Sequence, residues 1–217
     1  MNPQTIETIG TRIIKIGEAE MFKVRNVNNN KDEDGRLPTY FLEGALWSAE
    51  SLNKLTAKSG PPNWCAAFAS YCYRKGYAEA GKDLSALDGR NAKGQPVRWK
   101  MSALAKDNKP IFEKRGLFVA ASEVLSGDQV LTGAARVPGL GDLVIYEHHA
   151  ALLVEFKKDK GGVWWMHTLE GNTYILKEGR KVWGIHNKRY KVGEIKRLLG
   201  FGLGGTRDLT ASPGTSA

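Results

Sequence analysis

Cys65 is the residue of this sequence best placed to act as a nucleophile. It follows Pro61, Pro62 and Asn63, and the small and apolar residues after it have helical spacing. Proline does not continue a helix backward and asparagine is a good N-cap, so we expect a helix over residues 66–75 with the cysteine in its first turn. Free backbone N–H groups and the helix dipole at that end favour a thiolate, the reactive form of cysteine.

A thiol nucleophile needs a general base, and two adjacent histidines are available further along the chain. His148 and His149 lie between two runs typical of strands, residues 143–147 and 150–156, and we expect a tight turn at the histidines. Side chains alternate between the two faces of a strand, so only one of the two imidazoles can face the cysteine. The other is expected at the surface or in contact with substrate.

A third polar group can orient the imidazole. The next β-rich run, residues 163–169, leads directly into Glu170, Gly171 and Asn172. In thiol hydrolases the imidazole takes the proton of the thiol, and a carboxylate or amide holds the ring in the required tautomer. The end of this strand is therefore expected to complete a cysteine–histidine site.

Together these segments resemble the CHAP family (cysteine, histidine-dependent amidohydrolase/peptidase), papain-like enzymes that cut peptidoglycan. The matching segments are Trp64-Cys65-Ala66-Ala67-Phe68, Gly141-Asp142 followed by a hydrophobic run and a histidine, and Glu170-Gly171-Asn172, in the order found in the family. Each segment alone is a weak signal, but the three in sequence are fairly specific. The resemblance covers roughly residues 40–175.

The resemblance implies a role for each matching position. Cys65 is expected to be the nucleophile, His149 the general base, Glu170 the residue that orients the imidazole, and Asn172 a supporting polar group. The family usually has glycine where this chain has His148. Three aromatic side chains are expected to line the substrate groove: Trp64, His148 and Trp165.

The order of the predicted elements indicates an α+β fold, with N-terminal helices packed on a C-terminal antiparallel sheet. Apolar residues have helical periodicity over residues 5–16 and 40–55, and from residue 143 onward the signals are those of strands, ending with a helical turn at 194–199. The resemblance makes this fold papain-like. We expect one catalytic domain over residues 1–200, an insertion at about 90–138 that shapes the groove, and a flexible Gly/Ser/Thr-rich tail over 201–217.

Composition limits the location and the partners. The formal net charge is +9, which favours anionic surfaces such as wall polymers, and the N-terminal residues have neither the charged start nor the apolar core of a signal peptide. No apolar run is long enough to span a membrane. We expect a protein made in the cytoplasm that acts at the cell wall or periplasm after phage-type lysis or specialised export. Its expected partners are peptidoglycan, an immunity protein or a component of an export apparatus, rather than nucleic acid.

The sequence bears on two possible metal ions, zinc and calcium. There is no His-Glu-x-x-His and no Cys-x-x-Cys, so zinc is not expected. Asn30, Asp32 and Asp34 have the spacing that opens a calcium loop, but Phe41 occupies the position of the bidentate glutamate. A solvated acidic turn is the favoured interpretation, so no cofactor is expected and calcium stays a weak alternative.

The sequence thus predicts a peptidoglycan hydrolase that cleaves an amide bond, as an amidase or endopeptidase, by a Cys-His-Glu mechanism. It would act as an exported antibacterial toxin or a phage lysin. Two alternatives stay open: a non-catalytic basic module that binds wall polymer or nucleic acid, and a cysteine protease acting on a protein. Thiol reactivity separates the first alternative from an enzyme, because an activated Cys65 should be alkylated far faster than the other cysteine, Cys72.

Overall fold

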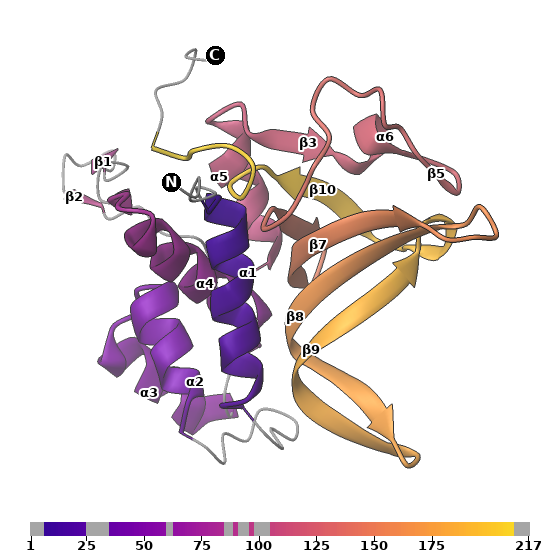
Figure 1. Ribbon diagram of the computed structural model, residues 1–217. Helices are drawn as coiled ribbons and strands as arrows, with labels where there is room; N and C mark the ends of the chain where they lie inside the picture. The colour runs from indigo at the N-terminus through magenta and orange to yellow at the C-terminus, as the bar shows by residue number, and fades with distance from the viewer. Residues whose placement is uncertain are drawn as a thin grey trace, which may run out of the picture.

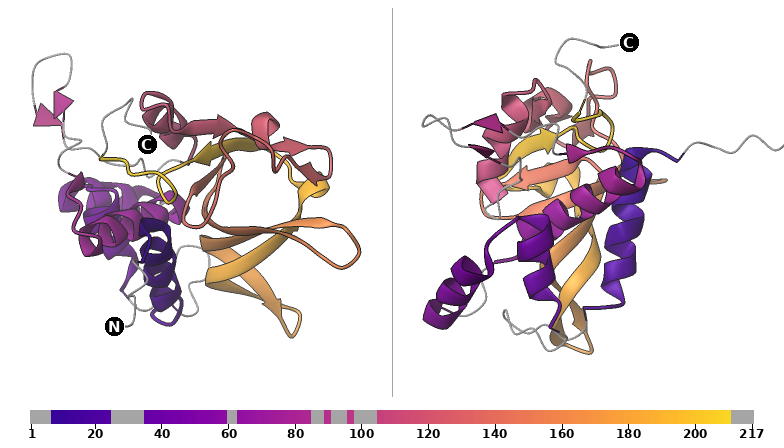
Figure 2. Two further views of the ribbon diagram at one scale, coloured as in Figure 1. Left: turned by 45° about the horizontal axis from the view of Figure 1, so that its top comes forward. Right: turned by 90° about the vertical axis from the view of Figure 1, so that its left-hand side faces the viewer.

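The computed structural model describes residues 7–24, 35–59, 63–84, 89–90, 96–97 and 105–210. Helices from the first part of the chain pack against one face of a six-stranded antiparallel sheet built from the second part (Figure 1 and Figure 2). This confirms the predicted α+β fold. Within the described residues, no helix combines the length and the apolar character needed to cross a bilayer.

The helices divide differently from the prediction. The stripe over residues 40–55 is not one helix, because Leu46 has a left-handed backbone (φ 54°) that ends the first segment before the next begins. The helices and helical turns are α1 (Ile9–Met21), α2 (Leu37–Thr39), the π-helical turn η1 (Tyr40–Gly44), α3 (Ala49–Ser59), α4 (Cys65–Glu79), η3 (Ala105–Asn108), α5 (Lys109–Glu113), α6 (Ala121–Val124) and η4 (Val192–Glu194).

The large sheet has the strand order β3-β10-β6-β7-β8-β9, and all neighbours are antiparallel. Its strands are β3 (Phe118–Ala120), β6 (Leu143–Tyr146), β7 (Ala150–Lys158), β8 (Trp164–Lys177), β9 (Arg180–Lys191) and β10 (Leu198–Gly202). Two short pairs lie outside it, β1 (Gly89–Arg90) with β2 (Pro96–Val97), and β4 (Leu125–Ser126) with β5 (Gln129–Val130).

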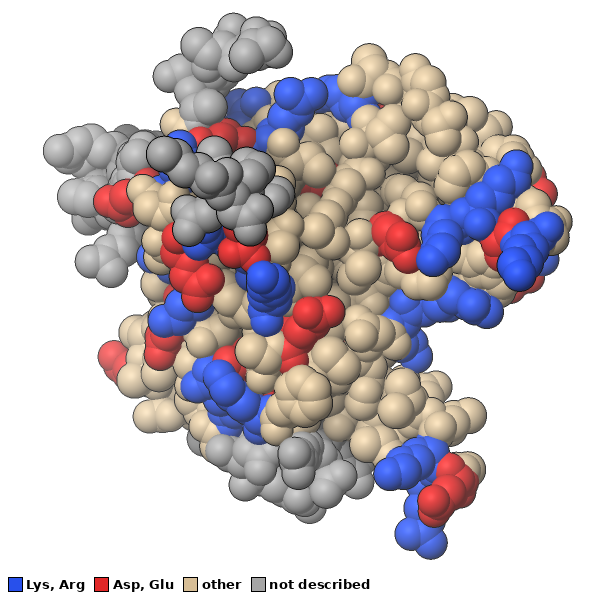
Figure 3. Space-filling view, in the orientation of Figure 1, with Lys and Arg blue, Asp and Glu red and all other residues tan. Residues whose placement is uncertain are grey.

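Strand β8 changes its surroundings part-way along its length. Its first half pairs with both β7 and β9, whereas from Thr173 onward it pairs with β9 alone. The second half of this pair therefore projects from the sheet as a hairpin, separate from the β7–β8 hairpin (Figure 1). Between the two projecting hairpins the surface is hollowed, and Lys and Arg side chains gather around both tips (Figure 3).

Helix α4 lies at the centre of the molecule, packed between α1, η1 and the strands β7 and β8. Every residue from Cys65 to Tyr73 is buried. The rings of Trp64 and Phe68 pack with that of Tyr40, with 5.7 Å between the ring centroids of Tyr40 and Trp64. The cysteine is thus held on a helix that has little freedom to move.

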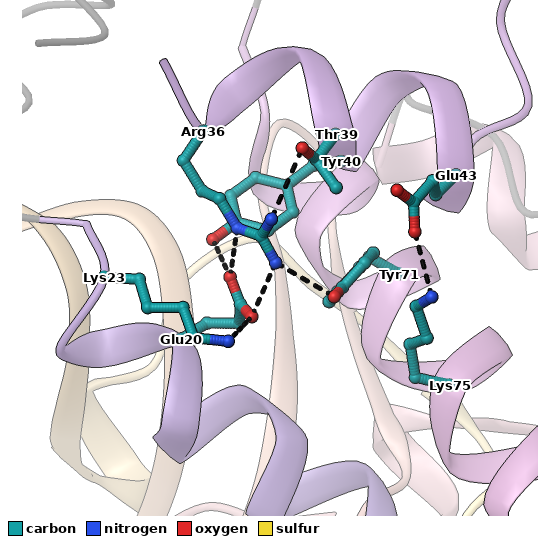
Figure 4. A network of polar contacts seen from close by, with 8 residues as sticks. All are labelled: Glu20, Lys23, Arg36, Thr39, Tyr40, Glu43, Tyr71 and Lys75. Atoms are coloured by element: carbon teal, nitrogen blue, oxygen red, sulfur yellow. Dashed lines mark hydrogen bonds and ion pairs between the residues drawn. The ribbon is translucent and has the colours of Figure 1, made fainter. Parts of the chain in front are cut away.

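A buried carboxylate, that of Glu20, fastens α1 to the α2–η1 segment (Figure 4). Both oxygens of Glu20 accept from Arg36, with distances of 2.7 and 2.8 Å, and Lys23 and Tyr40 donate to the same carboxylate. Arg36 also donates to the hydroxyl of Tyr71 on α4. Three segments of the helical layer are joined by this one network.

Two predictions about the C-terminal part of the chain are wrong, the start of the tail at residue 201 and the helical turn at 194–199. The residues from 201 do not begin a tail, because β10 is an interior strand of the sheet and Leu203 and Leu209 are buried. The hydroxyl of Tyr77 accepts from the backbone N–H of Leu209, which fixes this segment on α4. Only residues 211–217 of the predicted tail lie outside the described part. The predicted helical turn at 194–199 is also wrong, since η4 ends at Glu194 and β10 follows.

The proposed insertion, residues 90–138, is described in part. From Ala105 onward it is built into the domain: β3 is an edge strand of the large sheet, and Val119, Val124 and Val130 pack in a second hydrophobic cluster with residues of β6, β7 and β10. Asp142, at the start of β6, fastens the end of this region. Its carboxylate accepts from the backbone N–H groups of Gly139, Gly205 and Thr206, as expected of a turn-fixing residue.

Candidate active site

Cys65 is the first residue of α4. The N-cap is Trp64 rather than the predicted Asn63, and its side chain makes no capping hydrogen bond. Trp64 is fully buried, so it forms part of the core and cannot line a groove as expected. Cys65 itself is 3% exposed.

His149 lies beside the cysteine, at the end of the turn between β6 and β7. Its Nε2 is 2.9 Å from Oε2 of Glu170. The ring is 28% exposed, whereas His148 is 73% exposed and points toward Glu147 at 3.9 Å. Both histidines lie in the turn and not in strand geometry, so the alternation argument does not apply to them, and His149, the position indicated by the resemblance, is the imidazole that reaches the carboxylate.

Glu170 connects the histidine to the interior of the sheet. It is 1% exposed, and its Oε1 accepts a 2.6 Å hydrogen bond from the hydroxyl of Thr168. Tyr190 on β9 also donates to it. Neither partner was among the residues predicted for the site. Thr168 could have been found, because it lies two residues before Glu170 and so on the same face of the strand. Tyr190 could not, since its position depends on the β8–β9 register.

The ionisation of the three groups is coupled. Burial raises the pKa of the Cys65 thiol, but the hydrogen bond and charge of His149 and the backbone N–H groups of Ala150 and Ala66 outweigh it, so the pKa lies below its ordinary value. Burial lowers the pKa of His149, but its bonds to Cys65 and Glu170 raise it to about 10. These opposite shifts favour a thiolate–imidazolium pair.

Glu170 holds the other side of this pair as an anion. Burial raises the pKa of its carboxyl, yet the hydrogen bond and charge of His149, with the hydrogen bonds of Thr168 and Tyr190, bring the pKa below the ordinary value. The imidazolium therefore lies between two negative groups. Because Nε2 is used by Glu170, Nδ1 is the ring nitrogen left for Cys65.

Asn172 does not join these three residues. It lies in a bulge of β8 with a left-handed backbone (φ 55°), and its amide donates to Oδ1 of Asn63 at 3.2 Å. Gly171, just before it, is buried so closely that a Cβ would come within 2.7 Å of the Trp64 ring. The bulge thus fastens the end of the Glu170 segment to the loop before Cys65, which is a scaffolding contact and not a contact with the imidazole.

Trp165 lies away from the site. Its indole N–H donates to Asp159 at 2.8 Å, and the guanidinium of Arg189 lies 3.9 Å from the ring centroid. In the register of the sheet Trp165 faces Lys157 and Lys191, toward the tip of the β7–β8 hairpin. It does not line the pocket at His149.

The calcium-loop residues Asn30, Asp32 and Asp34 lie outside the described residues. Within the described part of the chain, no three His, Cys, Asp or Glu side chains come together as metal ligands. The second cysteine, Cys72, is free and fully buried on the same helix as Cys65. Burial raises the pKa of its thiol well above the ordinary value, so it has none of the activation of Cys65.

A pocket of about 360 Å³ opens beside His149. Its walls come from the β6–β7 turn and from the segment between β9 and β10, which no sequence pattern connects with the site. The lining residues are Tyr146, His148, His149, Tyr190, Glu194, Ile195, Lys196 and Arg197. His148 is therefore the one predicted groove residue that borders a pocket at the site.

No family model, no curated protein and no solved structure matches this chain. An assignment of function therefore depends on the arrangement of Cys65, His149 and Glu170, and on the three sequence segments that carry them. Those segments come from a helix start, a turn and the middle of strand β8, which are far apart in the sequence.

Proposed function

We propose that this protein is a cysteine-dependent hydrolase of amide bonds with a papain-like mechanism, and that it acts on peptidoglycan. One observation carries the proposal: a thiol at a helix start, an imidazole and a buried carboxylate contact one another in that order. The pKa of each of the three groups is shifted in the direction that favours its charged form. A histidine that merely filled space in the core would not need an anion on each side.

The reaction proceeds in two halves. The Cys65 thiolate attacks the carbonyl carbon, and the imidazolium of His149 protonates the leaving nitrogen as the C–N bond breaks. The resulting thioester is then attacked by water, which gives its proton to the same imidazole, and the C–S bond breaks to release the acid and restore the pair. Glu170 keeps Nδ1 directed at the sulfur throughout by accepting from Nε2.

The tetrahedral oxyanion needs donors that do not already serve the sulfur. The backbone N–H groups of Ala66 and Ala150 interact with the sulfur. The N–H of Cys65 lies in the first turn of α4, where a backbone N–H has no hydrogen-bond acceptor within the helix. It is the donor we assign to the oxyanion, with the helix dipole adding to the stabilisation.

Peptidoglycan is proposed as the substrate because the three segments together resemble the CHAP family. The basic charge of the chain is consistent with attraction to anionic wall polymers. A role as a phage lysin or as an exported antibacterial toxin follows from the same proposal, and a toxin would require an immunity protein that blocks the site.

Digestion of purified sacculi tests the proposal. The unmodified protein should release soluble muropeptides, whereas Cys65→Ala should release none. Cys72→Ala is the matched control, because it removes a thiol from the same helix and should retain activity in the folded fraction. The masses of the products identify the amide bond that is cut. Equal release, or no release, from the unmodified protein and Cys65→Ala would refute the assignment, and a panel of peptides would then test for a protease acting on proteins.

A further inference from the structure

We propose that the pocket beside His149 binds the amine side of the substrate and selects a leaving group that carries a free carboxylate. This inference rests on the proposed function, because it assigns the pocket to one side of the bond that Cys65 attacks. It specifies the chemical class of substrate, which the three catalytic groups alone leave open.

The position of the pocket assigns it to the leaving group. The pocket is lined by His149 and by Tyr190, and Tyr190 donates to Glu170, the partner of Nε2. The pocket therefore extends from the Nε2 side of the imidazole, opposite the Nδ1 assigned to the sulfur. The acyl part of a substrate becomes bonded to sulfur, whereas the leaving nitrogen receives its proton from the imidazole. The portion of substrate beyond the histidine is therefore the released amine.

The charges around the pocket favour an anion. Lys196 and Arg197 both line it, and within the described part of the chain Lys196 forms no ion pair. The carboxylate of Glu194, the acidic lining residue, accepts from Lys191 at 3.2 Å. Two cations are thus set against one paired carboxylate. A free carboxylate on the ligand could form charge-assisted hydrogen bonds with either cation.

A carboxylate of the chain itself competes for one of these cations. Oε2 of Glu147 lies 3.8 Å from Nε of Arg197, a distance too long for a hydrogen bond. The pair is also exposed to solvent, which makes such an interaction weak. Arg197 can therefore turn to a bound anion at little cost, and removal of the Glu147 charge should strengthen anion binding.

The remaining walls suit a short peptide. The rings of Tyr146 and Tyr190 and the side chain of Ile195 give the pocket an apolar lining around its polar groups. A volume of about 360 Å³ lies at the lower end of the range for small-molecule sites. The pocket fits one or two small residues ending in a carboxylate better than a polysaccharide strand or a nucleic acid.

Binding to the Cys65→Ala protein tests the inference without turnover. The probes are alanylalanine and its C-terminal amide, which differ only in the carboxylate and both carry the amine that the reaction would release. NMR titration should show roughly 3- to 10-fold tighter binding of the acid, and this preference should shrink as salt is raised. Lys196→Gln with Arg197→Gln should abolish the preference, whereas Glu147→Gln should increase it.

A matched control removes the same two charges elsewhere. Lys177→Gln with Arg180→Gln changes an exposed lysine and an exposed arginine that face each other in the strand register at the tip of the β8–β9 hairpin. This double variant should keep the preference for the acid over the amide. Equal binding of acid and amide, or a preference that survives loss of Lys196 and Arg197 charge, would overturn the inference. Failure of the proposed function would give a different result. Sacculi would then stay intact, but the protein would still prefer the acid, and Lys196→Gln with Arg197→Gln would still abolish that preference.

Discussion

The Oε2 atom of Glu170 lies 2.9 Å from Nε2 of His149, and the carboxylate is almost completely shielded from water. A buried carboxylate is stable as an anion only when it is well paired. The imidazole supplies a proton on one side, and Thr168 and Tyr190 donate on the others. The reactivity of Cys65 is thus linked to hydrogen bonds that lie deep in the sheet, and each of them can be tested.

The first prediction concerns the two thiols. At pH 6 iodoacetamide should alkylate Cys65 at least ten times faster than Cys72, because the pKa of Cys65 is lowered and that of Cys72 is raised by burial. The rates are measured by mass spectrometry of the peptides that contain each cysteine. His149→Ala should remove the difference at this pH, since the pair that holds the thiolate is lost. Slow alkylation of both cysteines in the unmodified protein would instead favour a binding module.

Glu170→Gln isolates the effect of one charge. The amide keeps an oxygen that can accept from Nε2 but removes the anion, so the pKa of His149 should fall from its value of about 10 and the pKa of Cys65 should rise. The midpoint of the pH profile for Cys65 alkylation should move upward by at least about one unit. An unchanged profile in a folded variant would show that Glu170 does not act on the thiol through His149.

Two tyrosines near Glu170 provide a matched pair of substitutions. Tyr190→Phe removes a donor to Glu170, so it should raise the pKa of that carboxyl and lower the free energy of unfolding, measured by urea denaturation, by about 1 kcal/mol. The hydroxyl of Tyr146 is buried and has no hydrogen-bond partner within the described part of the chain. Tyr146→Phe should therefore leave stability unchanged or raise it, because an unsatisfied group is removed. A larger loss of stability in Tyr146→Phe than in Tyr190→Phe would contradict both expectations.

Much of the site could be predicted from local sequence patterns. Proline and asparagine before small apolar residues indicated the start of α4, and runs typical of strands, bounded by turn residues, indicated β6, β7 and the first half of β8. These are local signals, so they place Cys65, His149 and Glu170 on their elements without knowledge of the tertiary structure. The resemblance then assigned the three residues to one site, and the distance from His149 to Glu170 is consistent with that assignment.

The errors arose where packing between distant segments decides the structure. The glycines of β10 suggested a tail, but a Cβ at Gly202 would come within 2.7 Å of the Phe112 ring, so the absence of a side chain lets this aromatic ring cover the strand. The strand predicted over residues 163–169 continues to Lys177 in β8, because the Gly171–Asn172 bulge lets the pairing with β9 continue. Trp64 resembled a groove residue, and only the stacking with Tyr40 reveals that it belongs to the core.

The network around Glu20 yields a prediction about stability and pH. Burial raises the pKa of this carboxyl, but hydrogen bonds from Arg36, Lys23 and Tyr40 outweigh it and bring the pKa to about 2. The folded pKa lies below the unfolded value, so the stabilisation is complete above about pH 4.5 and is lost as the pH falls toward 2. Glu20→Gln should therefore lower the free energy of unfolding by about 2–3 kcal/mol at pH 7 and by much less near pH 2.5.

The control for this change is an ion pair of the same chemistry on the surface. Glu50 and Lys54 lie 2.6 Å apart on α3, and both side chains are exposed, so Glu50→Gln should cost less than about 0.5 kcal/mol at either pH. Urea unfolding at the two pH values measures both variants. Because the Glu20 network contains neither His149 nor Glu170, the folded Glu20→Gln protein should keep the alkylation rate of Cys65. A loss of stability that is equal at both pH values would show that Glu20 contributes through packing and not through its charge.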